Sequence, residues 1–210
     1  MTFLRKMTKL AMVPVASAMM MFGAVAAQAE VLTFTSNLDG SQEVPTPNFL
    51  FPTGVATLSV DTMAETLSFS LSVDAINTFQ LNDGLVAAPV GPVHLHNAGF
   101  GQNGPIVVPF AFNTTDYQNT ANGFDLNVTN LAYSDAVALS GSTLSFSDFV
   151  AALNSGLFYI NVHTDEFPGG QIRGQLASAG SAVVPVPGAA ILFVTAMAGA
   201  AGIRRKRRTA

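Results

Sequence analysis

The sequence predicts an all-β domain, an antiparallel β-sandwich that contains one short helix. In residues 66–73, apolar side chains alternate strictly with Thr and Ser, which is typical of a strand with one buried and one hydrated face. Turn-forming residues separate several runs of this kind, and convincing helical periodicity occurs only once in the middle of the chain. Several short strands at this spacing favour a sandwich or a barrel.

The expected elements follow from the same patterns. Strands with one buried face are predicted at residues 31–35, 54–60, 66–73 and 124–131. A central strand, apolar almost throughout, is predicted at residues 157–162. Turns are predicted at residues 39–40, 82–84, 122–123 and 168–170. The one helix is expected over residues 148–154, capped by Ser147 and ended by Gly156.

The amino-terminal end has the pattern of a secretory signal peptide. Arg5, Lys6 and Lys9 precede an apolar run over residues 10–26, and the small residues Ala27 and Ala29 flank Gln28. This order of charged, apolar and small residues predicts a signal peptide over residues 1–29, with signal peptidase cutting after Ala29. The main domain is then expected over residues 31–177, followed by a linker at residues 178–183.

The carboxyl-terminal end combines an apolar segment with a basic cluster. Residues 183–203 are apolar apart from two prolines and Thr195, and residues 204–208 are all Arg or Lys. About 20 apolar residues span a bilayer, and a following basic cluster stays in the cytoplasm. We therefore expect a transmembrane helix whose carboxyl end is cytoplasmic, although the part after Pro187 is short for a stable span.

This tail resembles the PEP-CTERM class of bacterial sorting signals, and more closely its VPLPA-type variant. The matching motif is Val184, Pro185, Val186, Pro187 and Gly188, with the apolar segment and the basic end after it. The sequence departs from that variant at Val186, where Leu is usual, and at Gly188, where Ala is usual. The resemblance implies a sorting signal over residues 184–208 and recognition by an exosortase, a membrane cysteine protease that would cut near the motif.

The charges are distributed unevenly between the ends and the middle. Eight of the nine Lys and Arg residues lie in the two terminal segments, so Arg173 is the one cation that faces all thirteen acidic residues in the middle. Such an acidic domain repels nucleic acid and anionic membranes, which excludes nucleic-acid binding. The chain has no cysteine, so disulfides and cysteine chemistry are excluded as well.

The three histidines are the candidate metal ligands. His94 and His96 are two residues apart, so on a strand they point to the same face, and His163 on a neighbouring strand could supply a third nitrogen for copper or zinc. The alternative is structural: the imidazoles form hydrogen bonds across the sheet and fix its register. The spacing does not decide between the two.

Three other motifs do not point to a site. Residues 99–104 match G-x-G-x-x-G, but a strand-like segment follows instead of the helix that a dinucleotide site needs, so we predict a flexible loop. Asp165 and Glu166 are adjacent and would diverge on a hairpin, unlike the carboxylates of a glycosidase. Arg173 is expected to form a structural ion pair, with Glu43 or Asp165 as its partner.

Three segments of the middle domain resemble the CHRD domain, first named from chordin. They are residues 38–45, residues 94–96 with the glycine loop that follows, and residues 159–176. The resemblance implies an extracellular β-sandwich without an established enzymatic activity, immunoglobulin-like or superoxide-dismutase-like in fold. Gln171 departs from the family, which commonly has an acidic residue there. The histidine pair on a strand is also similar to the copper strand of Cu/Zn superoxide dismutases.

Together these observations predict an exported, surface- or matrix-associated interaction module without enzymatic activity or a required cofactor. Its expected partners are signal peptidase, an exosortase and the membrane. A copper- or zinc-binding protein of the periplasm or cell surface is the alternative, with His94, His96 and His163 as ligands. A metal-dependent redox enzyme that uses the same histidines is a third possibility.

Overall fold

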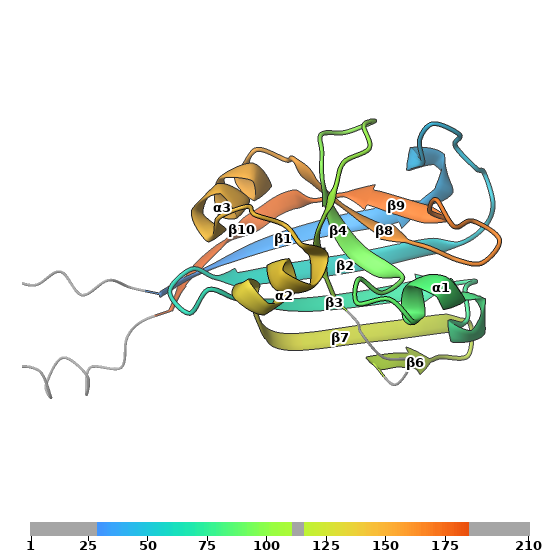
Figure 1. Ribbon diagram of the computed structural model, residues 1–210, viewed down its shortest axis with the longest axis horizontal. Coiled ribbons are helices and arrows are strands. Elements are labelled where there is room, and N and C mark those ends of the chain that lie inside the picture. Colours follow the sequence, from blue (N-terminus) through green and yellow to red (C-terminus); the bar gives the residue numbers. More distant parts are fainter. Residues whose placement is uncertain (1–28, 111–115, 185–210) are drawn as a thin grey trace, which may run out of the picture.

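The computed structural model describes residues 29–110 and 116–184, which form one antiparallel β-sheet with a few short helices (Figure 1). Residues 1–28 of the expected signal peptide, including Ala27, and all residues of the expected sorting motif and transmembrane segment after Val184 lie outside the described residues. Val183 and Val184 themselves belong to a strand, β10 (Ala177–Val184). Within the described part, no helix is long and apolar enough to cross a membrane. The strands are β1 (Ala29–Asp39), β2 (Thr53–Asp61), β3 (Thr66–Asp74), β4 (Val93–Asn97), β5 (Ile106–Pro109), β6 (Tyr117–Asn119), β7 (Gly123–Ala132), β8 (Phe158–Val162), β9 (Ile172–Gln175) and β10 (Ala177–Val184).

The sheet folds back on itself in the manner of a sandwich. Its strand order is β5-β4-β8-β9-β1-β2-β3-β7-β6, and β10 pairs with the first part of β1. Figure 1 shows β4 lying across β2 and β3, although these strands are well separated in the strand order. The fold places two parts of one sheet face to face, and the mostly-β, antiparallel prediction is confirmed.

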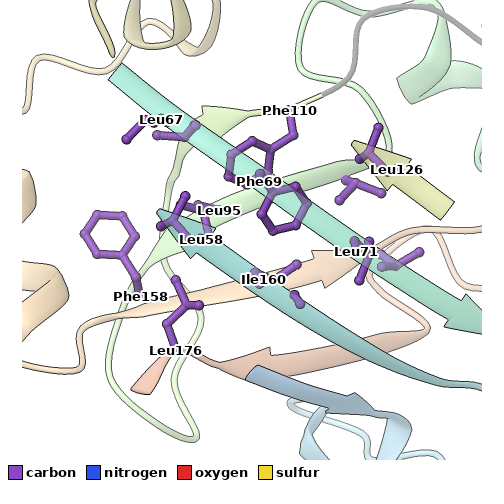
Figure 2. Packing of buried hydrophobic residues seen from close by; sticks show 14 of the residues in the cluster. Leu58, Leu67, Phe69, Leu71, Leu95, Phe110, Leu126, Phe158, Ile160 and Leu176 are labelled. Atoms are coloured by element: carbon purple, nitrogen blue, oxygen red, sulfur yellow. The ribbon is translucent and has the colours of Figure 1, made fainter. Parts of the chain in front are cut away.

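The apolar core fills the space between the two parts of the sheet. Phe69 on β3 stacks on Phe110, which follows β5, with ring centroids 3.8 Å apart and planes only 5° from parallel. Figure 2 shows this pair among leucines and isoleucine from both sides. The other labelled members are Leu58, Leu67, Leu71, Leu95, Leu126, Phe158, Ile160 and Leu176, all buried.

The strands agree with the sequence patterns that predicted them. On β2 and β3 every second residue is buried and the residues between are more exposed, as the alternation predicts. All five residues of β8 are buried, as expected of a central strand. The expected linker at residues 178–183 lies within β10, which pairs with β1 from Ala29↔Val184 to Thr35↔Ala177.

The helices differ from the single one predicted. Helix α3 (Phe146–Asn154) begins two residues earlier than expected, and its cap is Ser145, whose hydroxyl accepts a hydrogen bond from the Asp148 N–H at 3.2 Å. Helix α2 (Tyr133–Ser140) begins after Ala132, which has no capping side chain, so the sequence carries no start signal there. Helix α1 (Asp83–Val86) is a single turn that follows the predicted turn residue Asn82.

Candidate metal centre

The three histidines come from adjacent strands of the sheet. His94 and His96 lie on β4, which pairs with β8 in the register His94↔Asn161 and His96↔Tyr159. His163 follows β8 directly, and its N–H donates to the Pro92 carbonyl at 2.9 Å, so the strand pairing continues past the end of β8. Two-residue alternation along both strands then gives all three imidazoles the same face of the sheet, opposite the apolar core.

The imidazoles converge on one point. One ring nitrogen from each histidine lies within 4.8 Å of those from the other two. The ring centroid of His94 is 4.7 Å from that of His96 and 4.7 Å from that of His163, and the His96–His163 distance is 6.1 Å. Nitrogens that ligate one tetrahedral ion lie roughly 3–3.5 Å apart, given metal–nitrogen distances of about 2.0–2.1 Å. Ligation would therefore require the rings to move together.

One nitrogen of each ring is held by a backbone carbonyl. Nδ1 of His94 lies 2.9 Å from the Gly91 oxygen, Nδ1 of His96 lies 2.8 Å from the Gly104 oxygen, and Nδ1 of His163 lies 2.9 Å from the Pro168 oxygen. Because a carbonyl only accepts, each Nδ1 carries the proton and donates it. Each Nε2 is thereby left with a lone pair.

These Nε2 atoms are buried and have no hydrogen-bond partner among the described residues. Burial, together with the neighbouring His163 and His96, lowers the pKa of His94 to about 3. Burial likewise lowers the pKa of His96 to about 4, with the Gly104 hydrogen bond opposing the change. The pKa of His163 is lowered by burial too. All three imidazoles are therefore neutral at pH 7, the form that binds a metal ion.

An aromatic and cationic stack lies beside His96. The Tyr159 ring is parallel to the His96 ring, with planes 4° apart and centroids at 4.8 Å, and the Arg173 guanidinium carbon lies 3.6 Å from the Tyr159 centroid. Arg173 is only 1% exposed, and it donates to the Asn103 side-chain oxygen at 3.0 Å and to the Gln102 carbonyl at 2.7 Å. The hydrogen bonds of this cation thus go to the loop above it rather than to a carboxylate.

A buried carboxyl group lies near the same cation. Glu43 is 4% exposed, and burial raises its pKa to about 7, although Arg173 and a hydrogen bond with Asn161 lower it. A Cβ atom on Gly170 would collide with the Asn161 amide and with Oε1 of Glu43, and the φ angle of 127° also requires glycine there. Glu43 Oε1 and Asn161 Oδ1 have no hydrogen-bond partner within the described part of the chain.

The glycine-rich loop at residues 99–104 covers the site. Its Gly104 supplies the carbonyl for His96, and the Gly104 N–H lies 3.4 Å from the Tyr159 hydroxyl. Gln102 and Asn103 hold Arg173, and the Asn103 amide also donates to the Val44 carbonyl at 3.1 Å. The segment predicted to be a flexible loop is therefore tied down on several sides, and it packs over the histidines.

Fold and contacts define a one-sheet β domain with a buried cluster of three histidines beneath its loops. The chain belongs to the CHRD domain family, whose pattern it matches over residues 34–176. No curated protein and no solved structure matches the chain, so the choice between immunoglobulin-like and superoxide-dismutase-like folds stays a prediction.

The three segments that carry the family resemblance meet at this site. The first supplies Glu43, the second supplies His94 and His96, and the third supplies His163 and Arg173. Gln171, where the family commonly has an acid, is 5% exposed. Its N–H donates to the Val162 carbonyl at 2.8 Å, and its own carbonyl accepts from Asn48 at 2.8 Å.

Sequence reasoning found the histidines and singled out Arg173 and Glu43, but it missed Tyr159 and the carbonyl groups that hold the imidazoles. The stacking of Tyr159 on His96 could have been found from a register of β4 and β8, since the two residues are direct cross-strand neighbours. The three carbonyl partners could not have been found in this way, because they come from loops whose course the residue pattern does not determine.

Proposed function

We propose that this chain is an exported CHRD-domain protein that binds a transition-metal ion, copper or zinc, through His94, His96 and His163. One observation carries the proposal: three imidazoles lie together, each with a buried Nε2 that has no hydrogen-bond partner among the described residues, while every Nδ1 donates to a carbonyl. Metal-ligating histidines commonly donate the second ring N–H to such a carbonyl, because this fixes the tautomer and the ring orientation.

The structural alternative accounts for less of the geometry. Histidines that only fix the sheet register would bond across strands, whereas here each Nδ1 bonds to a loop carbonyl. Leaving a buried polar atom without a partner costs about 1–3 kcal/mol, and three such atoms side by side would raise that cost without any gain in stability. A metal ion that accepts all three lone pairs removes the penalty.

The test is metal analysis of protein purified from cells that express the full chain. We expect about one equivalent of copper or zinc in the parent protein and its loss in the His94→Ala and His96→Ala variants. Tyr117→Phe is the matched control, since the Tyr117 hydroxyl is also buried without a partner among the described residues but lies on β6, at the far end of the strand order from β4. Equal metal content in the parent and the histidine variants would rule the function out.

A second part of the proposal concerns delivery. Membership in the CHRD family supports an extracellular type of domain without enzymatic activity, and the two ends of the sequence support export and sorting by an exosortase. Replacing Pro185 and Pro187 by Ala should leave the protein in the membrane at its unprocessed mass. A mature protein found only in the cytoplasm after cell fractionation would contradict export.

A further inference from the structure

We infer that the three-histidine site holds copper as Cu(I) in preference to Zn²⁺. The inference rests on the proposed metal function and adds the identity and charge of the ion. It draws on the charge of the ligand set, the burial of the site and the number of its nitrogens.

The ligand set carries no negative charge. Among the described residues, the group that could hold an ion consists of the three histidines alone, without a carboxylate or a thiolate. Glu43, the buried acid nearby, has Arg173 and Asn161 as its electrostatic partners, not a histidine. An ion bound here therefore keeps its full charge, unlike zinc in sites that include thiolate or carboxylate ligands.

Burial makes that residual charge costly, and more costly for a divalent ion. The three Nε2 atoms are inaccessible to solvent, and buried Arg173 is close enough to His96 to help lower its pKa. The solvation cost of moving an ion into a low-dielectric interior grows with the square of its charge, so Zn²⁺ incurs roughly four times the cost of Cu(I). Repulsion by the guanidinium also doubles for the divalent ion.

The number of nitrogens favours the same ion. Zinc in structural sites takes four ligands in a tetrahedral arrangement, whereas among the described residues this site offers one nitrogen from each of three histidines, and the Nε2 atoms are inaccessible to solvent. Cu(I) is stable with two or three nitrogens, which is the number that this site supplies. Three nitrogens around one ion would lie about 3.5 Å apart at the usual metal–nitrogen distance, so here too the rings would have to move together.

The nearby charges should tune this preference in opposite directions. Glu43→Gln removes an anion and should raise the ratio of Cu(I) affinity to zinc affinity, whereas Arg173→Gln removes a cation and should lower it. Both replacements keep a polar amide at the position. Because Arg173 also holds the covering loop, Glu43→Gln carries the test if the arginine variant does not fold.

The experiment uses protein purified from the full chain and measures both affinities by competition. Competition with a Cu(I) chelator under anaerobic conditions gives the Cu(I) affinity, and competition with a zinc chelator gives the zinc affinity. Both affinities are measured at pH 8. We expect Cu(I) to bind at least about 100-fold more tightly than zinc, with the ratio about three-fold higher in Glu43→Gln. The X-ray absorption spectrum of the copper-loaded protein should show two or three nitrogen neighbours.

Each outcome separates the inference from the function on which it rests. Zinc binding as tightly as Cu(I), an unchanged or lower ratio in Glu43→Gln, or four or more neighbours around copper would each overturn the selection of Cu(I) while metal binding stood. Binding of neither ion would overturn the proposed function itself.

Discussion

The folded sheet has two parts, one that contains β2 and β3 and one that contains β4, β8 and β9. They share one apolar interior, but their outer faces differ. On β2 and β3 the outer positions are mostly Ser, Thr and Asp; none is buried, and half are exposed. On β4, β8 and β9 the outer positions lie beneath loops and carry histidine, tyrosine, asparagine and arginine. Polar groups on the first face are satisfied by water at no cost, whereas those on the second need partners inside the protein.

That difference indicates where function is placed. Six polar atoms on or beside the covered face have no hydrogen-bond partner among the described residues: the three histidine Nε2 atoms, Oδ1 of Asn161, Oε1 of Glu43 and Oε1 of Gln175. Native proteins rarely retain such groups for stability alone. Departures of this kind concentrate at functional sites, so we expect a ligand to bind at the covered face.

The largest effect should come from the shared interior. Phe69→Ala removes a ring that is 2% exposed and stacked on Phe110, and we expect the free energy of unfolding to fall by about 3–5 kcal/mol. Urea unfolding measures this change. Copper should stabilise the variant as much as the parent, because Phe69 contacts the core and not the histidines. Loss of metal binding in a folded Phe69→Ala protein would show that the two faces are coupled.

Metal addition should act on the covered face alone. At a free metal concentration one hundred times the dissociation constant, the folded state gains about 2.7 kcal/mol, which urea or thermal unfolding with and without metal detects. His163→Ala should abolish that gain, and Tyr117→Phe should keep it in full. A gain of equal size in His163→Ala would place the ion elsewhere.

Acidification should also act through the covered face. The pKa of His94 is lowered to about 3 and that of His96 to about 4, so between these values and about 6.5 the unfolded chain binds more protons than the folded one. The free energy of unfolding of metal-free protein should therefore fall as the pH drops below about 6.5. Urea titrations at several pH values, with a chelator present, measure the slope.

Glu43 should oppose that trend, since burial raises its pKa from 4.5 to about 7. Its folded carboxyl keeps a proton that the unfolded chain has lost, so this group contributes stability at the lower pH that is lost as the pH rises toward 7. Glu43→Gln removes the opposing contribution, and stability should then fall more steeply on acidification. A shallower slope in the variant would mean that the carboxyl is ionised in the folded state.

The exposed outer face of β2 and β3 (the open face) was predictable from sequence. The outer face of β4, β8 and β9 beneath the loops (the covered face) was predictable only in part. Local periodicity was enough to predict the alternation of buried and exposed residues in β3, and it was also enough to predict that His94 and His96 share one face. His163 comes close to the other two histidines because β8 pairs with β4, and these strands are far apart in the chain. The loop that supplies the Gly104 carbonyl to His96 was expected to be flexible. Periodicity reports which face a side chain occupies, but not what comes to lie above that face.

The smallest effect on the free energy of unfolding should come from a substitution on the open face. Ser70 on β3 is exposed and faces away from the core, so Ser70→Thr should change the free energy of unfolding by no more than about 0.5 kcal/mol and leave metal affinity unchanged. Asn161→Ser, on the covered face, makes a change of comparable size in a side chain that borders Glu43 and Gly170. Urea unfolding and metal competition on both variants should show a measurable loss only for Asn161→Ser. Equal tolerance at the two positions would mean that the loops cover this face without imposing any chemistry on it, and the contrast between the faces would then be one of burial alone.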